Sequence, residues 1–382
     1  MTMTSYVILA FSLLFPGTVL GQHRGELCEP SPSSSGTCKL VTDCPAVTSS
    51  ILHKEQYVRC GFEGKDEVVC CPDESTKKSD NSRISERKCK EYAEFVFEYH
   101  NNPVLSSQTE KVKVDRCGNQ RELLIPIGSN ANPRQFPHAA LLGYEDDNND
   151  NNGRILWLCS GSLISDQYVL TAAHCLNTPQ YSHPKYVLLG ELDIESENDD
   201  AKPERFGISS LIPHPNYKHP KVYDDIGLIK LDKKVELSPY IRPACLPTVS
   251  DEPEKKALVS GWALVDRTKS KPGPQYLMKQ VLERFTHQEC NTTYNRQNNR
   301  RLPEGIRDQT QICFGLRTET RDGCVAESGS PLQIHHKDLY CMQTIIGVTS
   351  FGIGCNVANH PDVHTRVYSY LDWIESIIWA EL

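Results

Sequence analysis

The sequence lacks the features that define several large classes of protein. It has no surplus of positive charge, because 41 Lys and Arg residues stand against 49 Asp and Glu residues for a net charge of −8. This balance argues against nucleic-acid binding. The only long apolar run lies near the N-terminus, and no integral membrane protein is indicated. An ordinary content of 23 Gly and 24 Pro among 382 residues excludes collagen-like and wholly disordered chains.

Cysteine is the residue type that the sequence has in abundance. Its 16 cysteines are natural in an oxidising compartment and costly in a reducing one. The apolar stretch Tyr6–Phe15 has the length of a signal peptide, and Gly21 is a suitable cleavage position, although Met1–Ser5 has no Lys or Arg. The alternative is a short buried segment of the mature fold. We expect residues 1–21 to be a signal peptide and the protein to be secreted and extracellular.

A compact first domain is predicted at residues 28–71, which hold six cysteines. A segment this short buries little apolar surface, so three disulfides would have to stabilise it. Six cysteines allow fifteen connectivities, and their spacing does not select one. A zinc site is the alternative, but the CxxC pairs of zinc knuckles are missing. The six are Cys28, Cys38, Cys44, Cys60, Cys70 and Cys71.

The rest of the chain divides into a linker and a larger domain. Residues 72–88 are polar and predict a linker, whereas Cys89–His100 has the apolar spacing of a short amphipathic helix. From about Ile125 onward, short apolar runs bounded by Gly, Pro, Asp and Asn indicate an all-β barrel or sandwich. Tyr370–Ala380 predicts a C-terminal helix with one apolar face. We therefore place a linker at 72–124 and the larger domain at 125–382.

Three polar residues of the larger domain stand in contexts typical of nucleophilic catalysis. His174 lies in Thr-Ala-Ala-His-Cys, Asp225 in Asp-Asp-Ile-Gly-Leu, and Ser328 in Glu-Ser-Gly-Ser-Pro-Leu. A serine hydroxyl becomes a good nucleophile when a histidine accepts its proton and a buried carboxylate orients the imidazole. Any one of the three alone would be more easily explained as structural. Together, in this order and these settings, they predict a catalytic triad.

With these motifs the sequence resembles the chymotrypsin-like (S1) serine proteases from Ile125 to Leu382. Matching stretches begin at Phe136 (Phe-Pro-His-Ala-Ala-Leu-Leu-Gly-Tyr), Cys159 (Cys-Ser-Gly-Ser-Leu-Ile) and Val259 (Val-Ser-Gly-Trp). The cysteine cluster at 28–71 resembles an arthropod clip domain, and the whole chain resembles the Snake-like clip-domain proteases. The resemblance implies a mainly β fold of two antiparallel β-barrels with the triad between them. It also implies a zymogen in an extracellular cascade of immunity, melanisation or patterning.

The resemblance also implies the disulfide pairs. In the clip domain these would be Cys28–Cys70, Cys38–Cys60 and Cys44–Cys71. In the protease domain they would be Cys159–Cys175, Cys290–Cys313 and Cys324–Cys355, with Cys117–Cys245 joining the linker to it. Cys89 and Cys341 are then left, and we expect them to pair.

The primary specificity pocket is expected around Asp322, six residues before the proposed nucleophile. A carboxylate at the base of this pocket would recognise Arg or Lys side chains; the alternative is a solvated loop aspartate. Ser350 and Gly352, in the family-like Ser-Phe-Gly stretch, would line the pocket. Asp362 stands where the family has a glycine of the pocket wall, so a second carboxylate would narrow the pocket or change how it binds a basic group. His364 replaces a tyrosine nearby.

Other departures from the family pattern affect activation and the oxyanion hole. The family's Gly-Asp-Ser-Gly-Gly-Pro has Ala326 and Glu327 in its first two positions here. The backbone N–H groups of Ala326 and Ser328 would hold the oxyanion, and Glu327 would receive the new N-terminal ammonium. Activation would require a cut between Leu124 and Ile125, where residues 125–128 read Ile-Pro-Ile-Gly instead of Ile-Val-Gly-Gly. Proline and a β-branched residue both restrict this segment.

Two further sites are suggested by short motifs. Asn291-Thr-Thr is an N-glycosylation sequon, a triplet that also arises by chance. The acidic loop from Glu191 to Glu204 has enough carboxylates for calcium, although a solvated run of charges is the simpler explanation. We expect no other cofactor and no resident metal.

The sequence therefore predicts a secreted clip-domain serine endopeptidase that is made as a zymogen and cuts after basic residues. Its partners would be a protein substrate, most simply a downstream zymogen, and an upstream activating protease. The alternative is a catalytically impaired homologue that acts as a binding cofactor, because the departures cluster around activation and the pocket while the triad is spared. A protease inhibitor finds no support.

Overall fold

The computed structural model gives the fold over most of the chain. It describes residues 24–30, 36–44, 47, 57–72, 82–101, 111–118, 128–145, 155–178, 182–250, 254–262, 276–294, 300–318, 327–352 and 357–380. The predicted signal peptide lies outside these ranges. Contacts divide the chain into two units, Met1–Asn81 and Ser82–Leu382. None of the helices in these ranges has the length and apolar character needed to span a membrane.

The first unit is a small antiparallel sheet held by three disulfides. Its strands pair in the order β1-β2-β4-β3, and all three bridges, Cys28–Cys70, Cys38–Cys60 and Cys44–Cys71, lie within the unit. Its buried centre consists largely of the half-cystines with Val68 and Val69, so the disulfides replace a conventional core. The elements are β1 (Leu27–Cys28), β2 (Gly36–Leu40), η1 (Val41–Asp43), β3 (Arg59–Glu63) and β4 (Asp66–Pro72).

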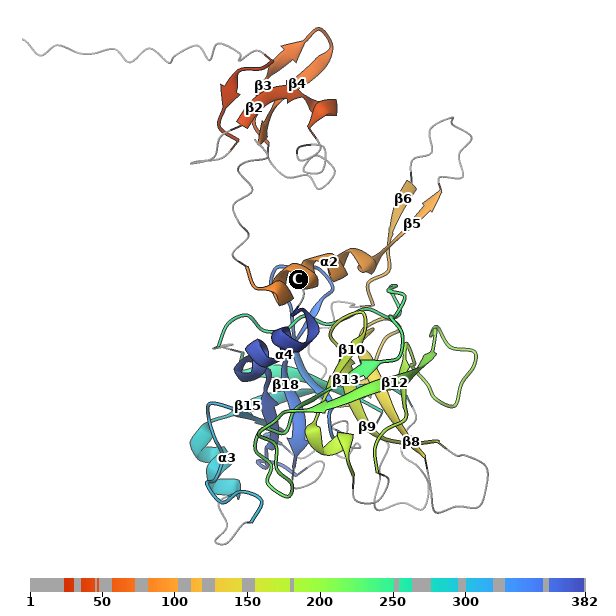
Figure 1. The fold of residues 1–382 in the computed structure, drawn as a ribbon, viewed down its shortest axis with the longest axis vertical. Coiled ribbons are helices and arrows are strands. Elements are labelled where there is room, and N and C mark those ends of the chain that lie inside the picture. Colours follow the sequence, from red (N-terminus) through yellow and green to blue (C-terminus); the bar gives the residue numbers. More distant parts are fainter. Residues whose placement is uncertain are drawn as a thin grey trace, which may run out of the picture. The chain divides into compact units, whose positions relative to one another are not determined.

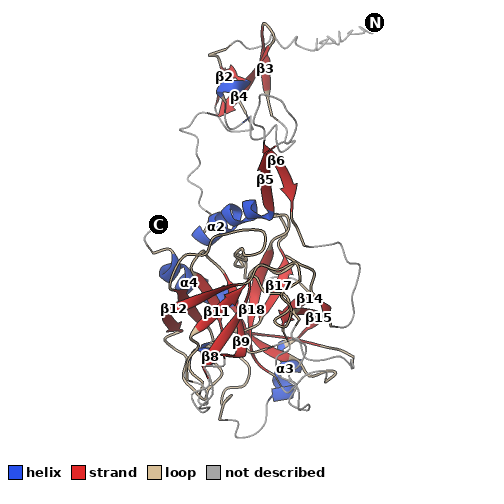
Figure 2. Ribbon diagram, turned by 90° about the vertical axis from the view of Figure 1, so that its right-hand side faces the viewer, coloured by secondary structure: helices blue, strands red, loops and turns tan. Residues whose placement is uncertain are grey.

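The second unit contains two six-stranded barrels (Figures 1 and 2). The first is closed in the order β10-β13-β12-β11-β8-β9. In the second, β14-β17-β18-β19-β16-β15 is closed by the pairing of β14 with β15, and β7 (Ser129–Asn130) adds to β15. The predicted mainly β, double-barrel fold is confirmed. The first barrel comprises β8 (Ala139–Glu145), β9 (Ile155–Leu163), β10 (Tyr168–Thr171), β11 (Tyr186–Leu189), β12 (Glu204–Pro213) and β13 (Gly227–Leu231). The second comprises β14 (Lys256–Gly261), β15 (Met278–Phe285), β16 (Gln311–Gly315), β17 (Pro331–His335), β18 (Gln343–Phe351) and β19 (Asp362–Arg366).

A buried polar chain joins the two barrels. His138, just before β8, has its Nε2 2.7 Å from Oε1 of Gln333 on β17, and Gln333 Nε2 donates to Ser260 Oγ on β14 at 2.9 Å. All three side chains are buried. Burial lowers the pKa of His138 to about 3, so its imidazole is neutral at physiological pH and donates to the amide oxygen. The barrels are thus held in register by directional hydrogen bonds as well as by apolar packing.

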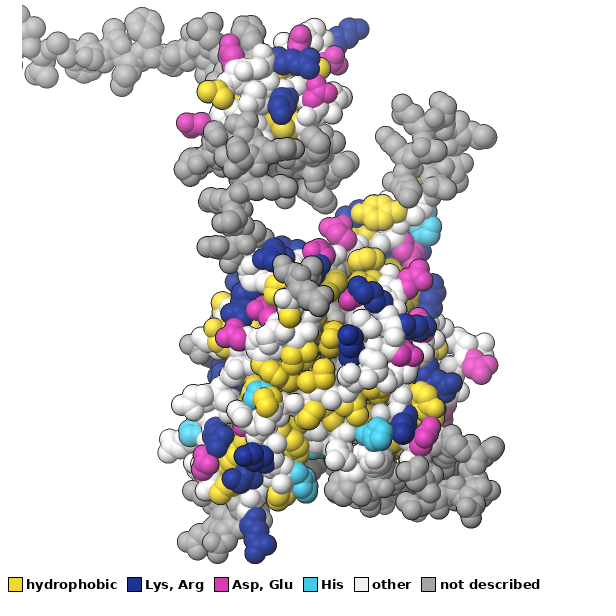
Figure 3. Space-filling view, viewed as in Figure 1, with side chains coloured by type: hydrophobic (Ala, Val, Ile, Leu, Met, Phe, Trp, Pro, Cys, Tyr) yellow, Lys and Arg dark blue, Asp and Glu magenta, His cyan; other side chains and the backbone are white. Residues whose placement is uncertain are grey.

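The C-terminal helix covers the first barrel as the apolar spacing predicts. η5 (Val367–Tyr370) leads into α4 (Leu371–Ile378), whose Leu371 and Ile374 are buried in the barrel's core cluster. On the face drawn in Figure 3, hydrophobic side chains gather near the middle of this unit and charged side chains of both signs surround them.

The linker differs from the prediction in both its helix and its disulfides. α2 spans Ile84–Ala93 rather than Cys89–His100, followed by η3 (Glu94–Val96) and a hairpin of β5 (Phe97–Asn101) and β6 (Lys111–Asp115). The predicted helix is wrong over 97–100 because the alternating side chains of Phe97–Asn101 pair with β6 instead. The first turn of α2 is stabilised by Glu375 of α4, a residue far away in the sequence. Its carboxylate accepts the backbone N–H and the hydroxyl of Ser85, at 3.2 and 2.6 Å.

Two disulfides join the linker to the barrels, with partners exchanged relative to expectation. Cys89 pairs with Cys245 and Cys117 pairs with Cys341, at Cα separations of 5.1 and 5.8 Å. The expected Cys117–Cys245 and Cys89–Cys341 pairs are therefore wrong. All four cysteines belong to one apolar cluster with Tyr92, Val96 and Met342. The expected and the observed pairs would both link the linker covalently to the barrels. The position of α2 beside Cys245 selects the observed pairs. Cys159–Cys175 and Cys290–Cys313 are as expected, whereas Cys324 and Cys355 lie outside the described residues.

We predict that peptide mapping of the unreduced protein will link the Cys89 peptide to the Cys245 peptide, and Cys117 to Cys341. The double variant C89S/C245S removes one bridge and should fold with the other intact, at a cost of about 2–5 kcal/mol in stability. The matched variant C89S/C341S has the same number of cysteines but removes one partner from each bridge. Cys117 and Cys245 should then give free thiols or non-native disulfides. A Cys89–Cys341 peptide in the native protein would contradict this assignment.

Candidate functional site

The residues predicted to carry the chemistry meet where the two barrels join, beginning with His174 and Asp225. His174 lies in η4 (Ala173–Leu176) after β10, and Asp225 lies just before β13. Because β10 and β13 are neighbours in the first barrel, their ends bring these residues together. His174 Nδ1 is 2.8 Å from Asp225 Oδ2, and the backbone N–H of His174 donates to Asp225 Oδ1 at 2.9 Å. The imidazole is thereby held in one orientation, with Nε2 facing away from the carboxylate.

The second barrel completes the surroundings of Asp225. Ser350 Oγ donates to Asp225 Oδ2 at 2.5 Å, and Thr365 Oγ1 donates to the backbone carbonyl of Asp225 at 2.8 Å. Ser350 lies at a bulge in β18, which turns its side chain toward the first barrel. Asp225 is only 1% exposed. Burial alone would raise its pKa, but the charge and hydrogen bonds of His174 and the Ser350 hydroxyl outweigh burial, so the pKa of Asp225 is lowered.

Ser328 is brought to the same place by a chain of short links. It lies in the turn before β17, and its carbonyl accepts the backbone N–H of Ser160 on β9 at 2.9 Å. Ser160 follows Cys159, which is bridged to Cys175, the residue after His174. Gly329 has a φ of +81° and leaves no room for a Cβ beside Ser160 and Thr171. Glycine is therefore required at the turn that presents Ser328.

The described hydrogen bonds include none between Ser328 Oγ and His174 Nε2. Such contacts are often long in a protein without substrate and shorten when the reacting complex forms. The geometry therefore brings an oriented imidazole and the backbone of Ser328 into one region.

Glu327 has a partner that the sequence did not lead us to expect. Its Oε2 accepts a hydrogen bond from Ser160 Oγ at 2.6 Å, and its backbone N–H donates to Ser330 Oγ at 3.2 Å. Ser160 is only 1% exposed. The only hint of this contact in the sequence was Ser160 itself, a polar residue directly after Cys159. It lies in the half of β9 that is buried.

Asp362 points its carboxylate toward the segment that follows Ser350. It is the first residue of β19, and Oδ1 occupies the space that a Cβ on Gly352 would fill. Gly352 thus makes room for Asp362, and their place in a substrate pocket stays a prediction. Burial raises the pKa of Asp362 to about 7. A carboxyl group that is half protonated near neutrality responds strongly to a nearby cation.

His364 lies deeper, on the same strand as Asp362. It is fully buried, and its Nδ1 is 3.2 Å from Thr349 Oγ1. Burial lowers its pKa to about 3. His364 is therefore a neutral, buried side chain in the middle of β19, and it adds no charge near Asp362.

Several expected site residues lie outside the described ranges. These are Leu124, Ile125, Asp322, Ala326, Cys324 and Cys355. The activation cut, the base of the primary pocket and one oxyanion donor consequently remain predictions.

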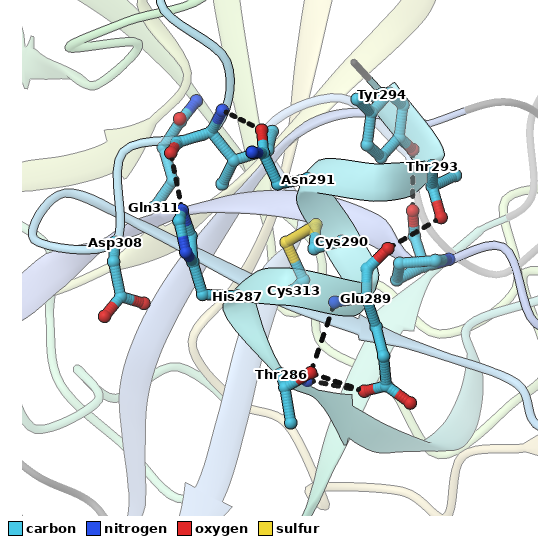
Figure 4. The surroundings of a disulfide bond; sticks show 12 residues. Thr286, His287, Glu289, Cys290, Asn291, Thr293, Tyr294, Asp308, Gln311 and Cys313 are labelled. Atoms are coloured by element: carbon cyan, nitrogen blue, oxygen red, sulfur yellow. Dashed lines mark hydrogen bonds between the residues drawn. A yellow bond between two sulfur atoms is a disulfide. The ribbon is translucent and has the colours of Figure 1, made fainter.

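Asn291 is placed on α3 (His287–Tyr294) beside the Cys290–Cys313 bridge (Figure 4). Its Oδ1 accepts the backbone N–H of Ile306 at 3.1 Å, and the sequon hydroxyl of Thr293 donates to the carbonyl of Glu289 at 3.0 Å. The sequon side chains therefore have structural roles in the folded protein. Glycosylation of Asn291 stays a prediction.

Metal binding has no assembled ligand set within the described ranges. Every group of three His, Cys, Asp or Glu ligand atoms found there contains two or more half-cystines, whose bridged sulfurs carry no thiolate. The carboxylates of the Glu191–Glu204 loop form no such group. Calcium binding by this loop stays a prediction.

Sequence reasoning missed the residues that support the predicted triad from a distance. Besides Thr365, these include Tyr370, whose hydroxyl donates to Asp224 Oδ1 at 2.8 Å, and Arg307, whose guanidinium lies 3.8 Å from Asp224 Oδ2. Asp224 has a φ of +53° and directly precedes Asp225. Its two partners fix the turn from which Asp225 enters the barrel junction. Hydroxyl and guanidinium groups so distant in sequence carry no local signal.

Comparison with known proteins gives a consistent family match. The family model described as Trypsin matches residues 125–374. "Serine protease snk" of Drosophila melanogaster is 32% identical over 364 residues, covering 94% of this chain and 80% of that protein. "CLIP domain-containing serine protease B10" of Anopheles gambiae is 30% identical over 404 residues, covering 98% and 99%. "Phenoloxidase-activating factor 3" of Holotrichia diomphalia is 31% identical over 288 residues, covering 72% and 76%.

We predict that Asp362→Asn will become more stable relative to the native protein as pH rises from 4 to 7. The native carboxyl, with its raised pKa, stays protonated up to about pH 7, whereas the unfolded carboxyl ionises near pH 4. Unfolding therefore releases a proton in this window, and stability falls with pH by up to about 1.4 kcal/mol per unit. Asparagine removes this loss.

Melting temperatures of both proteins at pH 4, 5.5 and 7 measure the effect. Asp338→Asn is the matched control, because the side chain of Asp338 is 71% exposed and its removal should shift the melting temperature equally at all three values. A parallel pH profile for Asp362→Asn and Asp338→Asn would contradict the burial of the Asp362 carboxyl.

Proposed function

The chain belongs to the trypsin family, among the clip-domain serine proteases of arthropods, and we propose that it is a secreted endopeptidase zymogen of an extracellular proteolytic cascade. The name of one relative, a phenoloxidase-activating factor, supports a role in activating another protein. The sequence has sixteen cysteines, and none of those in the described residues has a free thiol. This supports an oxidising, extracellular setting. The downstream target would be a protein, most simply another zymogen.

One observation carries the proposed activity. The fully buried carboxylate of Asp225 orients His174 through Nδ1, and Ser328 is linked to the same place through Ser160 and the Cys159–Cys175 bridge. In the proposed reaction His174 Nε2 takes the proton of Ser328 Oγ as the oxygen attacks the peptide carbonyl. The protonated imidazole then gives this proton to the leaving amine. In the second half-reaction, His174 takes a proton from the water that attacks the acyl carbonyl. It then returns this proton to Ser328 Oγ as the acyl group leaves.

Asp225 would stabilise the imidazolium that forms in each half-reaction. Its carboxylate already accepts three hydrogen bonds, so little reorganisation is needed when His174 becomes charged. The N–H groups of Ala326 and Ser328 would hold the developing oxyanion. Activation would require the cut at Leu124–Ile125 and an ion pair between the new N-terminus and Glu327.

Selection of basic residues would come from Asp322, with Asp362 as a second carboxylate beside Gly352. A bound guanidinium or ammonium would favour the ionised form of Asp362 and lower its pKa from about 7. Binding of a basic side chain would therefore strengthen as pH rises through neutrality.

The second candidate is a binding cofactor without catalytic activity. The position of the Asp362 carboxylate over Gly352 favours it, because this side chain takes up room in the expected pocket. In that case the clip unit and the barrels would serve to dock another protease or its substrate.

We predict that the protein cut at Leu124–Ile125 will react with a fluorophosphonate at Ser328 and hydrolyse Arg peptides. Ser328→Ala should abolish labelling, and Asp225→Asn should lower kcat by roughly 10³–10⁴-fold because it disturbs the histidine tautomer. Mass spectrometry of the labelled peptide and a chromogenic Arg substrate measure the two steps. Labelling without hydrolysis of Arg or Lys substrates would overturn the proposed specificity. No labelling of correctly cut protein would overturn the enzyme and leave the binding cofactor.

A further inference from the structure

Four exposed cationic side chains, which we call the basic patch, lie on two short segments of the second unit. Lys218 and Lys221 belong to the loop between β12 and β13, and the backbone N–H of Lys221 donates to the carbonyl of Lys218 at 2.9 Å. Arg300 and Arg301 lie between α3 and β16. The carbonyl of Arg301 accepts the backbone N–H of Val222 at 3.2 Å, which joins the two segments. The whole chain has a net charge of −8, so the patch is a local reversal of sign.

Two aromatic residues place the basic patch beside the predicted triad. Arg301 Cζ lies 5.8 Å from the centre of the Phe351 ring. Phe351 directly follows Ser350, whose hydroxyl donates to Asp225. Burial raises the pKa of Tyr217, the negative charge of Asp225 raises it further, and the positive charge of Arg301 opposes both. The Tyr217 hydroxyl is therefore close enough to the buried carboxylate and to the guanidinium to respond to each.

The carboxylates next to these segments already have a cationic partner. Arg307 donates to Glu304 Oε2 at 2.8 Å and lies 3.8 Å from Asp224 Oδ2. Within the part of the chain that the structure describes, the two lysines of the patch and Arg300 form no ion pair. Their positive charge is thus directed outward, where it attracts negative charge on an approaching chain.

We propose that the basic patch binds an acidic stretch of the protein substrate, directly ahead of the basic residue after which the chain is cut. This inference rests on the proposed function and names its substrate class more closely. The expected pocket for the basic side chain includes Ser350 and Gly352, and Phe351 lies between them. Substrate residues ahead of the basic one would follow this segment toward Arg301, where carboxylates meet guanidinium and ammonium groups.

An acidic peptide suits the basic patch better than a long polyanion does. The four cations come from only two short segments, so they match a few carboxylates rather than a continuous track of sulfates. The side chain of Glu304 is 57% exposed and borders the Arg300–Arg301 segment with negative charge. A peptide can present neutral residues at that point, whereas a sulfated glycan carries negative charge along its length.

A matched pair of cations exists elsewhere on the second unit. Lys202 and Arg205 are exposed, and each lies over an aromatic ring, at 4.5 Å from Tyr240 and 5.0 Å from Tyr186. Arg205 is eight residues before the end of β12 at Pro213, a distance of roughly 25 Å along an extended strand. The variant K202E/R205E therefore changes the net charge as much as K221E/R301E does, but leaves the patch intact.

The first experiment measures binding without catalysis. Fluorescent peptides ending in Asp-Glu-Asp-Gly-Arg-amide or Asn-Gln-Asn-Gly-Arg-amide are titrated with uncut Ser328→Ala protein, and fluorescence anisotropy gives each Kd. An exposed ion pair changes an equilibrium constant by about 1.5-fold to fivefold, so several together should favour the acidic peptide by about tenfold. K221E/R301E should lose this preference, and K202E/R205E should keep it. A peptide with three Lys residues in the acidic positions should bind K221E/R301E more tightly than it binds the unmodified patch.

The second experiment measures hydrolysis by the protein cut at Leu124–Ile125. Chromogenic forms of the same peptides should show about tenfold higher kcat/KM for the acidic sequence, and K221E/R301E should abolish the difference. Hydrolysis of the neutral peptide should be the same in all three proteins, which shows that both variants fold. Peptides with the acidic residues placed after the cut bond should gain no advantage.

The outcomes separate this inference from the proposed function. Equal Kd values for the acidic and neutral peptides would overturn the patch as an acidic-peptide site, and so would an acidic preference that survives in K221E/R301E. Binding of a heparin oligosaccharide but not of the acidic peptide would also overturn it. If the acidic peptide binds as expected but no peptide is hydrolysed by correctly cut protein, the recognition site stands and the proposed catalysis fails.

Discussion

The second unit depends on one buried carboxylate, that of Asp225. Its side chain comes from the first barrel, and its hydrogen-bond donors come from His174 in that barrel and from Ser350 in the other, while Thr365 of the second barrel binds its backbone. A buried carboxylate is tolerated only when such partners surround it, and losing one of them is costly. The barrels must consequently dock correctly before Asp225 can be buried. The barrel interface and the oriented histidine are therefore parts of the same interaction.

The linker is fixed to this body at points well separated along the chain. Two disulfides hold Cys89 and Cys117, and the guanidinium of Arg83 contacts both Asp372 and Glu375 of α4. The three bridges of the first unit are internal, so they contribute nothing to this attachment. A cut anywhere between Cys117 and the start of β7 would accordingly leave the linker bound to the barrels. In the proposed activation, cleavage would change the site through the new chain end while the first unit stays covalently attached.

The sequence predicted those parts of the fold whose signals are local. Short apolar runs from about Ile125 onward indicated the β-strands of the larger domain, and the apolar face of Tyr370–Ala380 indicated α4. His174, Asp225 and Ser328 were recognisable because each has a characteristic local context. The helix α2 was misplaced because Glu375, nearly 300 residues away, caps its start. The pairing of Cys89 with Cys245 was likewise decided by three-dimensional packing, and the Ser160–Glu327 contact depends on two barrels meeting. None of these long-range contacts leaves a periodic pattern in the sequence.

The bonding of three carboxylates, those of Glu327, Asp362 and Asp225, bears on whether the chain is a protease or a binding scaffold. Glu327 and Asp362 both deviate from the family. In the proposed function each carboxylate would bind a group that arrives later, an N-terminus or a basic substrate. Asp225 differs, since its bonding is already complete in the uncut chain. A scaffold has no need of a fully buried, hydrogen-bonded carboxylate, because apolar residues of similar volume often stabilise such positions equally well or better. That this chain keeps the costly arrangement around His174, although Glu327 and Asp362 depart from the family, supports the proposed protease over the proposed scaffold.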